Sequence, residues 1–205
     1  FKDGMNRVYS VGKKYAVAIL AFCLMDTHVH FVIYGEFDEC NKFIHDYIKL
    51  TSIRISNKYR EKNKLHRIPI SHQYIDNEFY LKTAICYVIK NPPVGGIPGN
   101  AYDYPWGSGP LYFRNSGEWS SPAWTNGSQS ENLTFNNLNV TEKRLLLRSK
   151  KTGESGNVKI IDGIIFPGEY VAYQIVERVF KTHKSFNFFM GITKEEDVEK
   201  RGGSL

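Results

Sequence analysis

Cysteine is scarce in this chain of 205 residues, which holds only Cys23, Cys40 and Cys86. An odd number of widely spaced cysteines with no CxxC pair fits neither a disulfide framework nor a cysteine-rich zinc site. Long apolar runs are also missing, and none approaches the roughly 20 residues of a membrane helix. The sequence therefore predicts a folded protein with no membrane partner, in a reducing, cytoplasmic setting.

Acidic side chains are scarce between residues 41 and 70, where Asp46 and Glu61 stand against eight Lys or Arg. The local charge is 8 − 2 = +6, which equals the formal net charge of the whole chain. A stretch of this kind is either a solvated helix face or a surface that follows the phosphates of a nucleic acid. Both interpretations stay open at this point.

The hydrophobic pattern predicts a mixture of strands and helices. The expected elements are neighbouring strands within 15–24 and 31–34, helices at 39–62, 78–90 and 169–181, and a small hairpin around Asp162-Gly163. Asp76 or Asn77 can cap the helix that begins at residue 78, and Pro92 and Pro93 should end it. Glycine, proline, serine and asparagine predominate from Gly95 to about residue 140, which is typical of a linker or irregular cover.

Two histidines interrupt the apolar run CLMDTHVHFVIY, at His28 and His30. On a β-strand, alternate residues share a face, so both imidazoles can bind one metal ion at about 2.0–2.2 Å. The opposite face, which should enter the core, carries Val29, Phe31 and Ile33. One histidine alone would be a structural residue, whereas two on one face favour a metal site.

Tyr87 and Asn91 are four residues apart, so they lie on one face at the end of the second expected helix. The carbonyl oxygen of an asparagine can ligate a cation, and the neighbouring phenol would then point toward whatever the cation holds. Tyr80 competes as a nucleophile because it lies on nearly the same face. However, the residue four positions after it is Ala84, which cannot ligate a metal ion.

Three blocks of sequence, taken in order, resemble the single-tyrosine HUH transposases, and most closely the REP-associated tyrosine transposases. The blocks are His28-Val-His30, Tyr87-Val-Ile-Lys-Asn91-Pro92 and Tyr102-Asp-Tyr-Pro-Trp106-Gly-Ser108. The resemblance covers about residues 1–113. The chain departs from the family pattern at Asp26-Thr27, where Pro-Asn is usual, at Pro93, where Val is usual, and at Gly107, where Ser is usual.

The resemblance implies an α+β fold with a ferredoxin-like antiparallel sheet and helices on one face, the HUH endonuclease fold. A small, mostly helical C-terminal extension should follow. The expected domains are a catalytic domain at 1–113, a linker or irregular cover at 114–140, and the extension at 141–205.

The resemblance also implies a metal-dependent single-stranded DNA endonuclease or transposase. Tyr87 would attack a backbone phosphate, leaving a 5′-phosphotyrosine and a free 3′-hydroxyl that can rejoin strands. His28, His30 and Asn91 would hold Mg²⁺ or Mn²⁺, and the partner would be single-stranded or hairpin DNA. A monomer is favoured over a homodimer.

Contacts with this DNA are expected from basic side chains and from aromatic rings. The basic candidates are Lys42, Lys49, Arg54, Lys58, Arg60, Lys82 and Lys90. Tyr102, Tyr104 or Trp106 would stack on unpaired bases if exposed, and would otherwise pack in the core.

Three other functions compete with this one. The first is a domesticated, non-catalytic protein that binds DNA hairpins, although such a module does not need His28, His30, Tyr87 and Asn91 together. The second is a replication or mobilisation initiator with the same chemistry, which often carries extra domains or a second catalytic tyrosine. The third is an unrelated zinc protein, which the lack of cysteine clusters disfavours.

Overall fold

The computed structural model describes residues 1–60, 70–114, 133–150, 156–194 and 198. These residues form two compact units, each assembled from separate stretches of the chain. Unit 1 contains the described residues of Phe1–Ala18, Tyr34–Ile68 and Trp124–Tyr170, and unit 2 those of Ile19–Ile33, Pro69–Ala123 and Val171–Leu205. Within the described ranges the elements include six α-helices and two two-stranded sheets. The predicted α+β class is confirmed, whereas the ferredoxin-like arrangement and the domain boundaries stay predictions.

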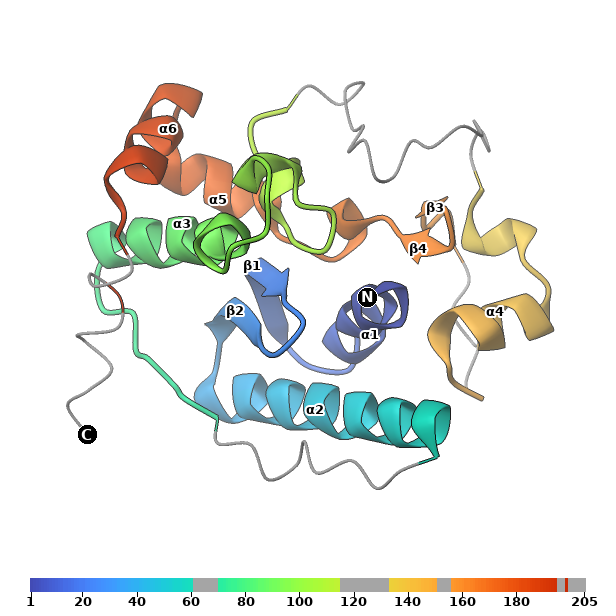
Figure 1. Ribbon diagram of the computed structural model, residues 1–205. Coiled ribbons are helices and arrows are strands. Elements are labelled where there is room, and N and C mark those ends of the chain that lie inside the picture. Colours follow the sequence, from blue (N-terminus) through green and yellow to red (C-terminus); the bar gives the residue numbers. More distant parts are fainter. Residues whose placement is uncertain (61–69, 115–132, 151–155, 195–197, 199–205) are drawn as a thin grey trace. The chain divides into compact units, whose positions relative to one another are not determined.

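Unit 1 is built around α1 (Lys2–Gly12), a helix that the sequence did not predict. It lies against α2 (Phe37–Tyr59), α4 (Val140–Leu147) and β4 (Ile164–Ile165), as Figure 1 shows. Its buried apolar residues follow helical spacing, which directs one stripe of the helix into the core. The core of this unit includes Tyr9, Phe135, Leu147 and Ile165.

The predicted hairpin around Asp162-Gly163 is confirmed. Strands β3 (Ile160–Ile161) and β4 pair antiparallel through a two-residue turn. Both turn residues have positive φ, 50° at Asp162 and 74° at Gly163, which is the conformation that a tight hairpin turn requires. The buried Asn6 holds the hairpin on α1, because its Oδ1 accepts from the Ile165 N–H at 2.8 Å and its Nδ2 donates to the Gly163 carbonyl at 3.0 Å.

Three elements of unit 1 meet at the carboxylate of Asp3 on α1. It accepts hydrogen bonds from Arg54 on α2 and from Arg148, the residue that caps α4, the latter at 3.0 Å. Burial alone would raise the pKa of this carboxyl group, but the two guanidinium groups together lower it below its usual value. Asp3 is therefore charged at neutral pH and cross-links three helices.

Strands β1 (Val17–Leu24) and β2 (Val29–Gly35) form the other sheet. Residues 19–33 of this pair belong to unit 2. The connection is so short that the strands must be antiparallel, and the Met25 N–H donates to the His28 carbonyl at 2.9 Å inside it. The two predicted neighbouring strands are confirmed.

The backbone of β1 is also hydrogen-bonded to two segments that are distant in the sequence. Leu24 N–H donates to the Trp106 carbonyl at 2.8 Å, and Ala172 N–H donates to the Ile19 carbonyl at 2.8 Å. Ser108 is fully buried, and its Oγ accepts from the Phe22 N–H at 3.0 Å. These bonds satisfy backbone groups that a bare strand edge would leave unpaired.

The expected burial pattern of β2 is wrong in one respect. Val29, Phe31 and Ile33 are only half-buried, whereas Val32, on the face of His30, is 4% exposed. The reason is that α3 (Glu78–Val94) packs on the face that carries His28 and His30. Both faces of this strand are therefore partly covered.

Helix α3 (Glu78–Val94) begins at Asn77, whose side chain accepts from the Tyr80 N–H at 2.8 Å. The expectation that Pro92 and Pro93 end the helix is wrong, because both lie in its last turn. A proline there removes few helical hydrogen bonds, and the Gly95 N–H closes the turn on the Asn91 carbonyl at 2.8 Å. Asn91 consequently stays inside the helix.

Helices α5 (Tyr173–Phe180) and α6 (His183–Ile192) pack beside α3 in unit 2. The helix predicted at 169–181 begins later than expected, because a 3₁₀ turn (Pro167–Glu169) precedes it. Thr193 follows the end of α6.

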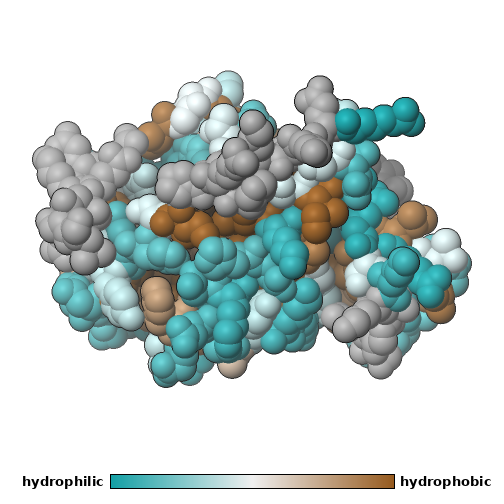
Figure 2. Space-filling model, turned by 90° about the horizontal axis from the view of Figure 1, so that it is seen from below, coloured by the Kyte–Doolittle hydropathy of each residue, from teal (hydrophilic) through white to brown (hydrophobic). Residues whose placement is uncertain are grey.

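Hydrophilic side chains cover most of the face shown in Figure 2, with hydrophobic residues visible in a narrower area between them. In the described part of the chain, no helix combines the length and the apolar character that crossing a bilayer requires.

Candidate active site

The two histidines lie side by side at the start of β2. Their ring centroids are 4.8 Å apart, with the planes at 84°. His28 is exposed and His30 is half-buried. One ring of the pair is therefore open to solvent, and the other lies deeper in the protein.

Helix α3 brings Tyr87 and Asn91 to the same place from 60 residues away. The Tyr87 ring lies edge-on to the His30 ring at 5.4 Å, and Asn91 Oδ1 lies 3.3 Å from His28 Nε2. Asn91 Nδ2 donates to the Tyr87 carbonyl at 3.3 Å. Because the amide nitrogen is bonded to its own helix, the amide oxygen faces the histidines. The structure thus brings together all four residues that the sequence singled out for chemistry.

The electrostatic setting keeps His30 neutral. Burial and, to a smaller extent, the nearby His28 lower the pKa of its imidazole, the side chain of Asn91 offsets part of the shift, and the resulting pKa is about 4. An imidazole with this pKa is uncharged at neutral pH, and the uncharged form is the one that binds metal ions.

The donor atoms fit a metal ion in spacing and in kind. Two ligands that each bond at 2.0–2.2 Å are separated by roughly 2.8–3.6 Å in octahedral or tetrahedral geometry, and His28 Nε2 and Asn91 Oδ1 are 3.3 Å apart. No group of three or more His, Cys, Asp or Glu in the described ranges is placed to hold a metal ion. Beside the two histidines, the amide oxygen of Asn91 is the group that could serve as a third donor.

Thr27 fixes the other side of the His28 ring, a role that the sequence did not predict. Its Oγ1 lies 2.8 Å from His28 Nδ1. A histidine whose Nε2 binds a metal ion carries its proton on Nδ1, and a partner for that proton orients the ring. The departure Asp26-Thr27 from the family pattern thus supplies a hydroxyl group at this point.

Two competing nucleophiles are buried. The Tyr80 hydroxyl donates to Gln73 Oε1 at 2.6 Å, and the residue is 3% exposed. Cys86, next to Tyr87, is fully buried, and burial raises the pKa of its thiol to about 12. Tyr87 is half-buried and its ring lies against His30, so it is the best placed of the three.

The basic residues predicted to contact DNA fall into two groups. Lys42, Lys49, Lys58 and Arg60 are exposed on α2 or at its end, in unit 1. The other three are half-buried and have partners within the protein: Arg54 binds Asp3, Lys82 binds Glu78 at 2.6 Å, and Lys90 donates to the carbonyls of Met190 and Thr193 at the end of α6. Of the exposed group, Lys42 also forms an ion pair, with Glu39 at 2.9 Å. Their contact with DNA stays a prediction.

The block Tyr102–Ser108 serves the fold more than the sequence indicated. Tyr104 donates its hydroxyl to the Leu24 carbonyl at 2.7 Å, and Tyr102 donates to Asn187 Oδ1 at 2.9 Å. Both rings and Trp106 are half-buried. The block therefore anchors the strand that leads into the histidine turn.

Comparison with family models, with curated proteins and with solved structures finds no match to this chain.

Proposed function

We propose that this protein is a metal-dependent, single-stranded DNA endonuclease or transposase of the HUH type that acts through a covalent tyrosine intermediate. The observation that carries the proposal is the meeting of His28 and His30 with Asn91 and Tyr87. A core does not require two imidazoles, an amide oxygen and a phenol to gather at one place, since buried polar groups are costly unless they are partnered.

His28, His30 and Asn91 would hold a divalent cation, which supplies positive charge that polarises a phosphate oxygen. Nitrogen donors suit Mn²⁺ better than Mg²⁺, which prefers oxygen ligands. Of the two metals that the resemblance implies, the donor set therefore favours Mn²⁺.

Tyr87 would form a bond from its phenolic oxygen to the phosphorus of a backbone phosphate, releasing its proton to solvent. The bond from phosphorus to the 3′-oxygen breaks, and that oxygen takes up a proton to become a free 3′-hydroxyl. The 5′-phosphotyrosine keeps the phosphodiester energy, so another 3′-hydroxyl can reverse the step and join strands. The partly buried position of Tyr87 against His30 orients the ring for this attack.

The proposal includes the ferredoxin-like arrangement of the HUH fold, with β1 and β2 as its histidine-bearing pair and α3 across one face. Support for this comes from the contacts of α3 with the histidine face of β2.

A trapping experiment tests the proposal. The protein is incubated with labelled single-stranded oligonucleotides, including hairpins from the sequence flanking its own gene, with Mn²⁺ or Mg²⁺. Tyr87→Phe and Tyr80→Phe are run beside it as matched variants of one helix. We expect a protein–DNA adduct that survives denaturation in the wild type and in Tyr80→Phe, and none in Tyr87→Phe.

An adduct that persists in Tyr87→Phe would refute the assignment of the nucleophile. The absence of any adduct with every substrate and metal, combined with tight hairpin binding, would instead support the domesticated binding protein.

A further inference from the structure

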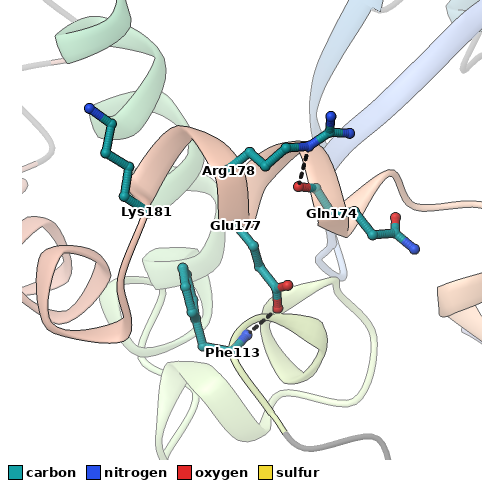
Figure 3. Close-up of a pocket in the computed structure, with 5 residues that line it drawn as sticks. All are labelled: Phe113, Gln174, Glu177, Arg178 and Lys181. Carbon is teal, nitrogen blue, oxygen red and sulfur yellow. Dashed lines mark hydrogen bonds between the residues drawn. The ribbon is translucent and has the colours of Figure 1, made fainter.

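The surface of unit 2 has a hollow beside α5. None of the residues that line it belongs to the proposed active site. The open hollow is lined by Phe113, Gln174, Glu177, Arg178 and Lys181, which Figure 3 shows. Four of these residues come from one helix and its end, and the fifth precedes it by 60 residues.

Hydrogen bonds fix the wall of this hollow. Glu177 Oε1 accepts from the Phe113 N–H at 2.7 Å, and Arg178 Nε donates to the Gln174 carbonyl at 3.3 Å (Figure 3). Phe113 has a φ of +55°, a left-handed conformation that is uncommon for a bulky residue. The bond to Glu177 holds it there, so its position is determined by the tertiary structure.

An aromatic surface and positive charge meet at this place. The Phe113 ring stacks on the exposed His183 ring, with centroids 5.9 Å apart and planes at 20°. Arg178 and Lys181 are exposed on the hollow, and Lys184 is exposed on the next turn of chain. The one carboxylate that lines the hollow, Glu177, already accepts a backbone hydrogen bond.

Aromatic rings interleaved with cations are the features by which proteins hold unpaired nucleotides, since rings stack on bases and cations follow the phosphates. We propose that this hollow binds a segment of single-stranded DNA, with a base against Phe113 and phosphates near Arg178 and Lys181. The choice of DNA rests on the proposed function, whereas the recognition of a single strand rests on the hollow itself.

Binding is measured in the full chain carrying Tyr87→Phe, with EDTA present, so that neither cleavage nor a metal ion contributes. The probe is a labelled oligo-dT of 20 nucleotides, followed by fluorescence anisotropy over a range of salt concentrations. The variant is R178E/K181E, and the control is R144E/K150E, which makes the same charge change at exposed residues of unit 1. R178Q/K181Q serves as a second, milder variant.

We expect R178E/K181E to bind at least about tenfold more weakly than the control and to lower the salt slope by roughly 1.4, the value for two lost phosphate contacts on a single strand. Phe113→Leu should weaken oligo-dT binding at least about fivefold while leaving the binding of inorganic polyphosphate, which has no bases, unchanged. Thermal melts check that each variant is folded.

Equal losses in R178E/K181E and R144E/K150E would overturn the proposal, because the effect would then be one of net charge alone. Equal losses of oligo-dT and polyphosphate binding in Phe113→Leu would overturn the role of base stacking. Since no adduct is measured, this result is independent of the trapping experiment on Tyr87.

Discussion

The cluster around Asp3 in unit 1 and the cluster around His30 in unit 2 both join side chains that are distant in sequence, but they differ in chemistry. At Asp3 a carboxylate meets two guanidinium groups, so the charges compensate one another and link three helices. At His30 the groups that meet are two imidazoles, an amide and a phenol, and burial keeps the His30 ring neutral by lowering its pKa to about 4. The ion pairs of Asp3 stabilise the fold, because each charge is matched by an opposite one. The nitrogen and oxygen donors gathered at His30 include no ion pair of this kind, which suits them to binding a ligand.

The largest expected effect that tests this difference is on metal binding. His30→Ala should weaken the binding of Mn²⁺ by at least about 100-fold, because it removes one of the three proposed protein ligands. Stability should change little in the absence of metal, since a neutral, half-buried ring is lost. Isothermal titration calorimetry with Mn²⁺ measures the affinity, and His45→Ala on α2 is the control. Unchanged affinity in His30→Ala would remove the metal site.

Asp3→Asn should have the opposite effect, lowering the stability of the protein without changing its affinity for Mn²⁺. We expect a loss of about 1–2 kcal/mol in the free energy of unfolding, because two partly buried ion pairs are broken, with no change in Mn²⁺ affinity. The lowered pKa of Asp3 means that its stabilising contribution is complete above the unfolded value near 4 and is lost as the pH falls through the folded value. Urea titrations at pH 7 and pH 3 should therefore show a smaller difference between variant and wild type at pH 3. A difference that grows at pH 3 would contradict this.

A smaller effect is expected at Thr27, which contacts His28 without contacting the proposed ion. Thr27→Val keeps the shape of the side chain but removes the hydroxyl group, and should weaken Mn²⁺ binding by about tenfold. Thr27→Ser should restore most of the affinity. With Mg²⁺ bound, the ¹⁵N chemical shifts of His28 should report the Nδ1–H tautomer in the wild type and a mixture in Thr27→Val. Identical spectra would exclude a positioning role.

The smallest expected effect is on stability, and it distinguishes Tyr80 from Tyr87 on the same helix. Tyr80→Phe removes the bond to Gln73 and should lower the free energy of unfolding by about 0.5–1.5 kcal/mol, while adduct formation stays at the wild-type level. A urea titration measures the change in stability, and the adduct assay measures whether the covalent product still forms. Loss of the adduct in a folded Tyr80→Phe protein would show that the two tyrosines share the catalytic role.

The sequence predicted those helices, strands and turns that depend on residues close to one another in the chain. The strand that carries His30, the DG turn of the β3–β4 hairpin and the helices α2 and α3 depend on residues within a few positions of one another, and the structure has each of them. Helix α1 was missed although its apolar stripe has helical spacing. The end of α3 was misplaced because a proline in the last turn breaks so few hydrogen bonds that packing can override it.

The sequence by itself determined which donors share a face: His28 with His30 on a strand, and Tyr87 with Asn91 on a helix. Only the tertiary structure decided that these two faces meet, that Asn91 directs its oxygen at His28, and that Arg54 and Lys90 bind partners within the protein. The physical reason is the separation along the chain over which each feature is determined. A face follows from backbone geometry over one or two turns, whereas burial and the choice of partner depend on which distant surface excludes water from that face.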